Sequence, residues 1–120
     1  NITHIGGKQP GATSMPSSVS RAAGIALTKA LSKELAEHKI LVNTVCVGII
    51  RSAQIERGWR EQSPHLTLAE YEQQIGRGVP LQRIGDAGEV ADLVAFLASA
   101  RASYITRTAK NVDGGLSGAV

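Results

Sequence analysis

The segment from Lys39 to Ile50 is apolar along almost its whole length and rich in β-branched side chains, interrupted by Asn43, Thr44 and Gly48. A strand with one face in water alternates apolar and polar residues, whereas a strand covered on both faces is apolar throughout. Strands of the second kind occur in parallel sheets that carry helices on both faces. Residues 39–50 therefore predict a buried strand and an α/β fold.

Helical patterns lie on both sides of this strand. Residues 17–37 repeat apolar side chains at the spacing of one helix face, and Pro16 suits the first helical turn because its missing N–H has no partner there. Further along, Thr67 with Glu70 and Asp86 with Glu89 show capping-box spacing, which predicts one helix to about residue 75 and another from residue 86.

Two other segments complete the expected order of elements. Residues 51–66 are polar and irregular, and we expect no regular structure there. Residues 108–112 predict a final strand, which Asp113-Gly114-Gly115 ends with turn-forming residues. Strands that alternate with helices along the chain favour a layered α/β domain with parallel strands.

Composition narrows the class of protein. The 120 residues suffice for one small domain, and aromatic side chains make up only 3% of them. Because the Lys and Arg residues are scattered and few rings could stack on bases, we expect no nucleic-acid partner. No segment reaches the ~18 apolar residues that a membrane-spanning helix needs, so we expect no membrane partner. The single Cys46 lies in an apolar run, which predicts a buried thiol and fits a reducing cytoplasm.

These blocks, in this order, resemble the second half of the short-chain dehydrogenase/reductase family. NITH at the start resembles the end of its fifth strand, and residues 18–50 resemble its fifth helix and sixth strand. VPLQRIGDAGEVADLVAFLAS, then YIT and NVDGG, resemble its C-terminal signature. The resemblance implies part of a Rossmann-like doubly wound parallel sheet, with strands 5, 6 and 7 side by side. It also implies that residues 1–120 are the C-terminal portion of such a domain, with the dinucleotide-binding half absent.

The same resemblance implies an NAD(P)-dependent oxidoreductase that acts on a carbonyl or alcohol. The family uses a Ser, a Tyr and a Lys for catalysis, and the matching positions here hold His4, Ser17 and Arg21. All three depart from the family pattern, so we expect the usual activity to be lost. No Gly-rich phosphate loop occurs among the 120 residues, so we expect this chain alone not to bind NAD(P) usefully.

Three readings of the altered site stay open. A reductase could use His4 as its acid or base, because an imidazole titrates near pH 6.5. A Ser activated by a His would instead suit an esterase-like hydrolase, with Ser17 as the nucleophile. The third possibility is a non-catalytic interaction module.

The family segment Pro-Gly-x-Ile-x-Thr, whose backbone meets the nicotinamide, corresponds here to residues 47–52. Gly48 and Ile50 match it, and Ser52 keeps a hydroxyl, so the resemblance implies that these three residues contact the cofactor. No cluster of residues with the spacing of metal ligands accompanies them, and we expect no metal site.

We also expect the chain to form a homo-oligomer. The helix over 17–37 carries a small-residue face at Ala22, Ala23 and Ala26, where another helix could come close. The strand near residues 1–4 would present an unpaired edge, which is a second route to self-association. Members of the resembling family form dimers and tetramers, which points the same way.

Overall fold

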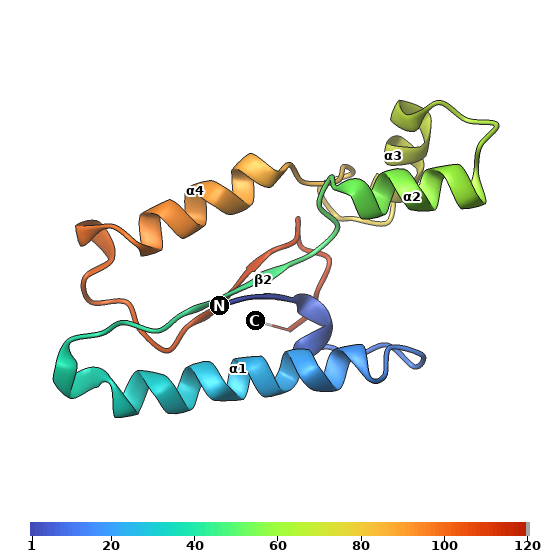
Figure 1. The fold of residues 1–120 in the computed structure, drawn as a ribbon. Helices are drawn as coiled ribbons and strands as arrows, with labels where there is room; N and C mark the ends of the chain where they lie inside the picture. The colour runs from blue at the N-terminus through green and yellow to red at the C-terminus, as the bar shows by residue number, and fades with distance from the viewer. Residues whose placement is uncertain (120) are drawn as a thin grey trace.

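The computed structural model describes residues 1–119 and has three parallel strands between helices (Figure 1). Strands β1 (Ile2–His4), β2 (Thr44–Val47) and β3 (Ala109–Val112) pair in the order β1-β2-β3. In the centre of the sheet, Val45 of β2 lies opposite Ile2 on one side and Lys110 on the other. This topology confirms the predicted α/β fold and the parallel arrangement of the three strands.

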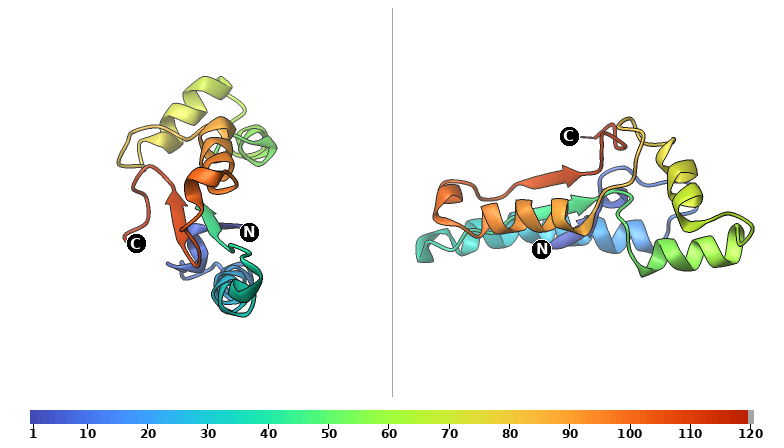
Figure 2. Two further views of the ribbon diagram at one scale, coloured as in Figure 1. Left: turned by 90° about the vertical axis from the view of Figure 1, so that its left-hand side faces the viewer. Right: turned by 90° about the horizontal axis from the view of Figure 1, so that it is seen from above.

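The longest helix and the last helix cover opposite faces of the sheet. Helix α1 (Ser17–Glu34) lies below the strands in Figure 1, and α4 (Ala87–Leu97) lies above them. Helices α2 (Ala53–Gln62) and α3 (Leu68–Gly76) extend from one end of the sheet, as the view from above in Figure 2 also shows. Three short 3-10 helices complete the order: η1 (Ile5–Gly7), η2 (Ala36–His38) and η3 (Ala100–Ala102).

Both predicted capping boxes are confirmed. At the start of α3, the Thr67 hydroxyl accepts a hydrogen bond from the Glu70 N–H, and the Glu70 carboxylate accepts one from the Thr67 N–H. At the start of α4, the Glu89 carboxylate accepts from the Asp86 N–H at 2.8 Å, and the Glu89 N–H donates to the Asp86 carbonyl at 3.1 Å. These bonds satisfy N–H groups that the first turn of a helix leaves without partners, which is why both helices begin where the sequence predicts.

The central strand is shorter than predicted, and the first helix also ends earlier. Only Thr44–Val47 has ladder pairing, because Lys39 adopts a left-handed conformation (φ 57°) and the Asn43 side chain bonds to the 105–108 turn. Beyond the strand, Ile50 forms one isolated parallel bridge with Gly85. The helix predicted to residue 37 stops at Glu34 and continues as η2.

The expectation of irregular structure over residues 51–66 was wrong, because this segment contains α2. Its apolar residues Ile55 and Trp59 stand four apart, and Glu56 and Arg60 form an ion pair at the same spacing. The Trp59 indole N–H donates to the Leu66 carbonyl at 2.8 Å and fixes the turn toward α3. Two large apolar side chains in ten residues give only a weak helical periodicity in the sequence.

Helix α1 turns a polar face toward the sheet. Its buried residues are Ser18, Thr28 and Ser32, and the Thr28 hydroxyl lies 2.6 Å from the Thr44 hydroxyl of β2. Part of its apolar surface faces outward, where Leu27 is 53% exposed and Val19 is 58% exposed, whereas Ile25 and Leu31 are half-buried. Hydrogen bonds therefore contribute to the attachment of α1 to the sheet, while much of its apolar surface stays uncovered.

The buried apolar core is small. Within residues 1–119, the buried apolar residues are Ile5, Val45, Cys46, Tyr71, Val79, Ile84 and Ala102. The chain measures 56 × 31 × 23 Å, and its radius of gyration is 16.1 Å, whereas compact domains of about 100 residues have a radius near ~13 Å. The chain is therefore more elongated than a compact domain of similar length. Across residues 1–119, none of the helices is both long enough and apolar enough to cross a bilayer.

Candidate active site

An open cleft of about 700 Å³ lies at the carboxyl ends of β1 and β2. Ligands of open α/β sheets bind outside the carboxyl ends of the strands, because loops and helix starts converge there. Its walls come from the end of β1, the segment that leads into α1, the first turn of α1, and the segment between β2 and α2. All six residues predicted from the resemblance line this one cleft: His4, Ser17, Arg21, Gly48, Ile50 and Ser52.

His4 ends β1 and caps η1. Its Nδ1 accepts a hydrogen bond from the Gly6 N–H at 3.0 Å, which fixes the orientation of the ring. Burial lowers the pKa of His4 below its ordinary value, and the positive charge of Arg21 lowers it further. His4 is therefore a neutral imidazole at pH 7.

Ser17 and Arg21 stand one turn apart at the start of α1. Ser17 is exposed, and within residues 1–119 no hydrogen bond joins its hydroxyl to His4. Arg21 is half-buried, and among the described residues it has no ion-pair partner. The cleft thus contains an uncompensated guanidinium beside a neutral ring, and it lacks the nucleophile–base contact that a Ser–His hydrolase requires.

Gly48 lies where the ends of β2 and β3 come together. Its N–H donates to the Val112 carbonyl at 2.9 Å, and a Cβ built on it would lie 2.6 Å from the Cβ of Asp113. Ile50 continues the same wall and contacts Gly85, where a Cβ would lie 2.7 Å from the Ile50 Cδ1. Only glycine allows this approach at position 48, where the ends of β2 and β3 pack together. Gly48 therefore lines the cleft with backbone atoms alone.

Ser52 precedes α2 and is the last of the predicted cofactor residues. Its carbonyl accepts from the Ile55 N–H at 2.9 Å, and its own side chain makes no capping bond. Gln54 and Ile55, on the first turn of α2, also line the cleft. The sequence analysis missed both, because they belong to the helix that it did not predict. The four-residue spacing of Ile55 and Trp59 is the one sequence feature that could have indicated this helix.

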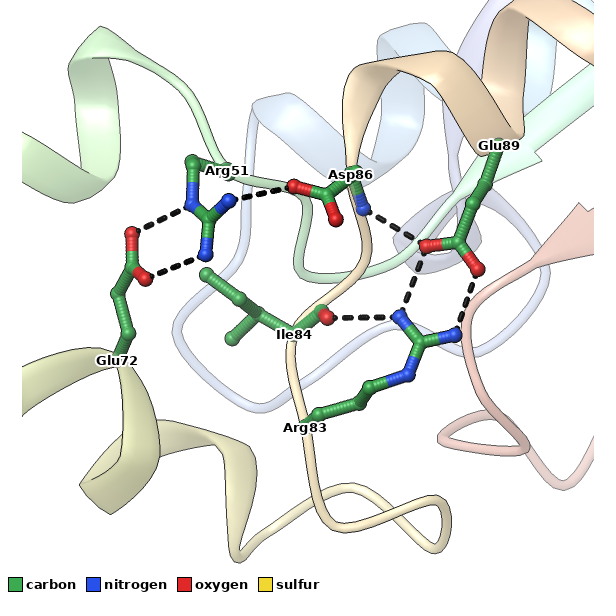
Figure 3. Close-up of polar contacts among 6 residues, drawn as sticks. All are labelled: Arg51, Glu72, Arg83, Ile84, Asp86 and Glu89. Carbon is green, nitrogen blue, oxygen red and sulfur yellow. Dashed lines mark hydrogen bonds and ion pairs between the residues drawn. The ribbon is translucent and has the colours of Figure 1, made fainter. Parts of the chain in front are cut away.

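An ion-pair network joins the segment after β2 to α3 and to the start of α4 (Figure 3). Arg51, between two cleft residues, donates twice to the Glu72 carboxylate of α3, at 2.8 and 2.7 Å, and once to Asp86 at 2.7 Å. Arg83 then binds Glu89 with two bonds of 2.8 and 2.6 Å. Exposed ion pairs each contribute little to stability, so the network orients α3 against the segment after β2 more than it stabilises the fold.

The described residues contain no group of three or more His, Cys, Asp or Glu side chains arranged to hold a metal ion. Cys46, predicted to be a buried thiol, is fully buried in β2. Burial raises its pKa, so the thiol stays protonated and unreactive near neutral pH.

Comparison with known proteins identifies the protein family. The family model described as enoyl-(acyl carrier protein) reductase matches residues 1–117. NADPH-dependent reductase BacG of Bacillus subtilis (strain 168) is 39% identical over 112 residues, which are 90% of this chain and 42% of that protein. Oxidoreductase UcpA of Salmonella typhimurium is 38% identical over 109 residues, covering 88% of this chain and 39% of that protein. The chain belongs to the short-chain dehydrogenase/reductase family.

Solved structures agree with this assignment. YwfH, an NADPH-dependent reductase involved in bacilysin biosynthesis, superposes with a TM-score of 0.87 at 37% identity, over 100% of this chain and 46% of that one. An apo short chain oxidoreductase from Pseudomonas aeruginosa PAO1, containing an atypical catalytic center, gives a TM-score of 0.91 at 29% identity, over 99% and 47%. The chain therefore spans less than half the length of these relatives.

Proposed function

We propose that the cleft is the site where a nicotinamide and a carbonyl or alcohol substrate meet in an NAD(P)-dependent oxidoreductase. Residues 1–120 would form the C-terminal portion of its Rossmann-like domain. One observation carries the proposal: the six positions taken from the resemblance come from segments far apart in sequence, and all of them line one cleft. NADPH-dependent relatives of similar fold support the choice of cofactor.

The residues present fit the nicotinamide end of such a cofactor. The backbone at Gly48, which has no side chain, and the apolar side chain of Ile50 suit a flat ring. The guanidinium of Arg21, which has no ion-pair partner among residues 1–119, can hold ribose hydroxyls or a phosphate. When bound, NAD(P) supplies or accepts the hydride. Since the 120 residues contain no Gly-rich phosphate loop, we expect them to bind the cofactor weakly on their own.

We infer that the usual acid–base route of the family is lost in this chain. A Ser17 hydroxyl does not ionise near neutral pH as readily as a phenol of pKa about 10, and it is too short to replace a tyrosine ring. Arg21 stays protonated, which makes it a poor proton relay. The hydrolase reading has no supporting contact, because the hydroxyl of Ser17 has no hydrogen bond to His4 among residues 1–119.

The proposal is tested by NMR titration of the ¹⁵N-labelled chain with reduced nicotinamide mononucleotide and, separately, with adenosine monophosphate. We expect the nicotinamide compound to shift the backbone amides of residues 48–52 at millimolar concentration, and the adenosine compound to leave them unchanged. Arg21→Met should weaken the binding. The matched control Arg101→Met removes an arginine that stacks on Phe96 and does not line the cleft, so it should have no effect. Equal shifts with both nucleotides, or none with either, would contradict the proposal.

We further propose that two copies of the chain associate through the outer face of α1. Val19 and Leu27 expose apolar surface there, and Ala22, Ala23 and Ala26 leave room for a second helix. An exposed apolar patch of this kind is uncommon on a stable monomer. Because the core is small, association of two copies would bury apolar surface that a single chain leaves in water. The outer edge of β1 is a second surface for the same association.

A further inference from the structure

The hydrogen bond between Gly6 and His4 decides which nitrogen of His4 carries a proton. A backbone N–H can only donate, so Nδ1 of His4, at 3.0 Å from the Gly6 nitrogen, must be the acceptor. A neutral imidazole has one N–H, and with Nδ1 unprotonated this N–H is on Nε2. His4 therefore carries the Nε2–H tautomer while the Gly6 contact is intact.

The same contact opposes protonation of the ring. An imidazolium has N–H groups at both nitrogens, and its Nδ1–H would point at the N–H of Gly6. The surrounding charges act in the same direction. Arg21 on α1 is positive, the opposing residue on β2 is Val47, η1 has no charged residue, and no Asp or Glu among residues 1–119 lines the cleft. Nothing on these elements stabilises a positive charge on His4.

Glycine at position 6 leaves room for the ring. A Cβ at Gly6 would lie 3.1 Å from the Nδ1 of His4 and 3.2 Å from the Oγ of Ser18. Ser18 is buried, and its hydroxyl donates to Ser14 at 2.7 Å, so it has little freedom to move. An added methyl group would therefore push the imidazole aside by a few tenths of an ångström and disturb its bond to the N–H of residue 6.

We propose that Gly6 is a positioning residue that holds His4 as a neutral Nε2–H donor, so that the cleft takes a ligand presenting an acceptor oxygen, namely a carbonyl. This inference rests on the proposed function for the identity of the cleft as the substrate site. It assigns His4 a role as hydrogen-bond donor toward the ligand, and it excludes His4 as a general base through Nε2, because that nitrogen already carries the proton. The apolar walls from Ile5, Ile49 and Ile55 suit a ketone with a hydrocarbon body.

The first test measures the tautomer directly. Side-chain ¹⁵N NMR of the chain at pH 7.5 should show His4 with Nδ1 unprotonated and Nε2 protonated, its signals being assigned by their loss in His4→Gln. The His4 pKa should lie below 6.5, the value of a free imidazole. In Gly6→Ala it should rise toward that value, because the contact that opposes protonation is disturbed. An Nδ1–H tautomer, or a pKa unchanged by Gly6→Ala, would overturn the assignment.

The second test measures the donor. Cyclohexanone at millimolar concentration should shift the His4 Nε2 resonance, whereas methylcyclohexane, which lacks the acceptor oxygen, should not. His4→Gln places an amide N–H near the position of Nε2 and should keep the binding of the ketone, as followed by the amides of residues 48–52. His4→Asn can still accept from Gly6 but does not reach the ligand, so it should lose at least half of that shift. Equal shifts in the two variants would overturn the donor role.

The proposal on the His4 tautomer and the proposal that the cleft binds a nicotinamide can be refuted independently. The tautomer of His4 is measured without any nucleotide, so it can hold while the nicotinamide titration gives no signal. Conversely, a nucleotide can bind at residues 48–52 while His4 shows the other tautomer.

Discussion

Replacing Gly48 by alanine tests the close approach between the ends of β2 and β3. The new Cβ would lie 2.6 Å from the Cβ of Asp113 and 2.7 Å from its Cα, whereas carbon atoms in contact are normally about 3.5–4.0 Å apart. Gly48 does not have a positive φ, so the cost arises from this collision and not from backbone strain. The ends of β2 and β3 would have to separate by roughly an ångström.

The magnitude follows from two contributions. Forcing an extra carbon into a filled space costs about 1–3 kcal/mol. Separation of the strand ends also weakens the 2.9 Å bond from the Gly48 N–H to the Val112 carbonyl, which contributes about 1 kcal/mol. We therefore expect Gly48→Ala to lower the free energy of unfolding by about 2–4 kcal/mol.

Urea denaturation followed by circular dichroism measures this change. With a slope of about 1–3 kcal/mol per molar urea, the midpoint should fall by roughly 1 M or more. Gly88→Ala is the matched control, because no atom lies within 4 Å of the added Cβ in the first turn of α4. The control should keep or slightly raise the stability, since alanine favours a helix over glycine by up to ~1 kcal/mol. Equal midpoints for both variants would refute the contact between Gly48 and Asp113.

Three further predictions concern the helix ends and the outer face of α1. Thr67→Ala removes the hydroxyl that caps α3 and should lower the free energy of unfolding by about 1 kcal/mol in the same urea assay, while a change near zero would show that the cap is not formed. Hydrogen bonds from Arg83 and from the backbone at the start of α4 lower the pKa of Glu89 to about 2. This folded-state pKa lies below the ordinary 4.5, so the contribution of Glu89 to stability is present above pH 4.5 and is lost as the pH falls toward about 2. The stability difference between the wild type and Glu89→Gln should vanish over that interval, and a difference constant with pH would contradict the assignment. Ala23→Arg should shift the sedimentation coefficient to that of a monomer, and a wild-type chain that is already monomeric at micromolar concentration would refute self-association through α1.

The sequence predicted the fold well where residues close together in the chain determine the structure. Capping boxes at Thr67 and Asp86 begin α3 and α4, since the side chains that satisfy the first N–H groups are adjacent in sequence. The apolar run over 39–50 correctly predicted a central strand but not its length. The left-handed Lys39 and the bonds of Asn43 to the 105–108 turn shorten the strand, and those bonds depend on a segment far along the chain.

The candidate site was predictable in its members but not in its geometry. The resemblance supplied all six positions, and the structure brings them to one cleft, although their catalytic and cofactor roles stay predictions. The bond between Gly6 and His4 depends on a 3-10 turn of three residues, too short to leave a periodic pattern. Gln54 and Ile55 were missed because α2 has only two apolar anchors in its ten residues.

The polar face that α1 turns toward the sheet affects the heat capacity of unfolding. Unfolding raises the heat capacity in proportion to the apolar surface that it exposes, and exposure of polar surface lowers it. The Thr28 hydroxyl is buried against Thr44 of the sheet, and Ser18 and Ser32 of the same helix are also buried, so hydroxyl groups make up part of the buried surface of α1. The heat-capacity change of unfolding should therefore be smaller than the ~12–15 cal/mol/K per residue of ordinary domains. A smaller value flattens the dependence of stability on temperature, so this chain should lose little stability on cooling.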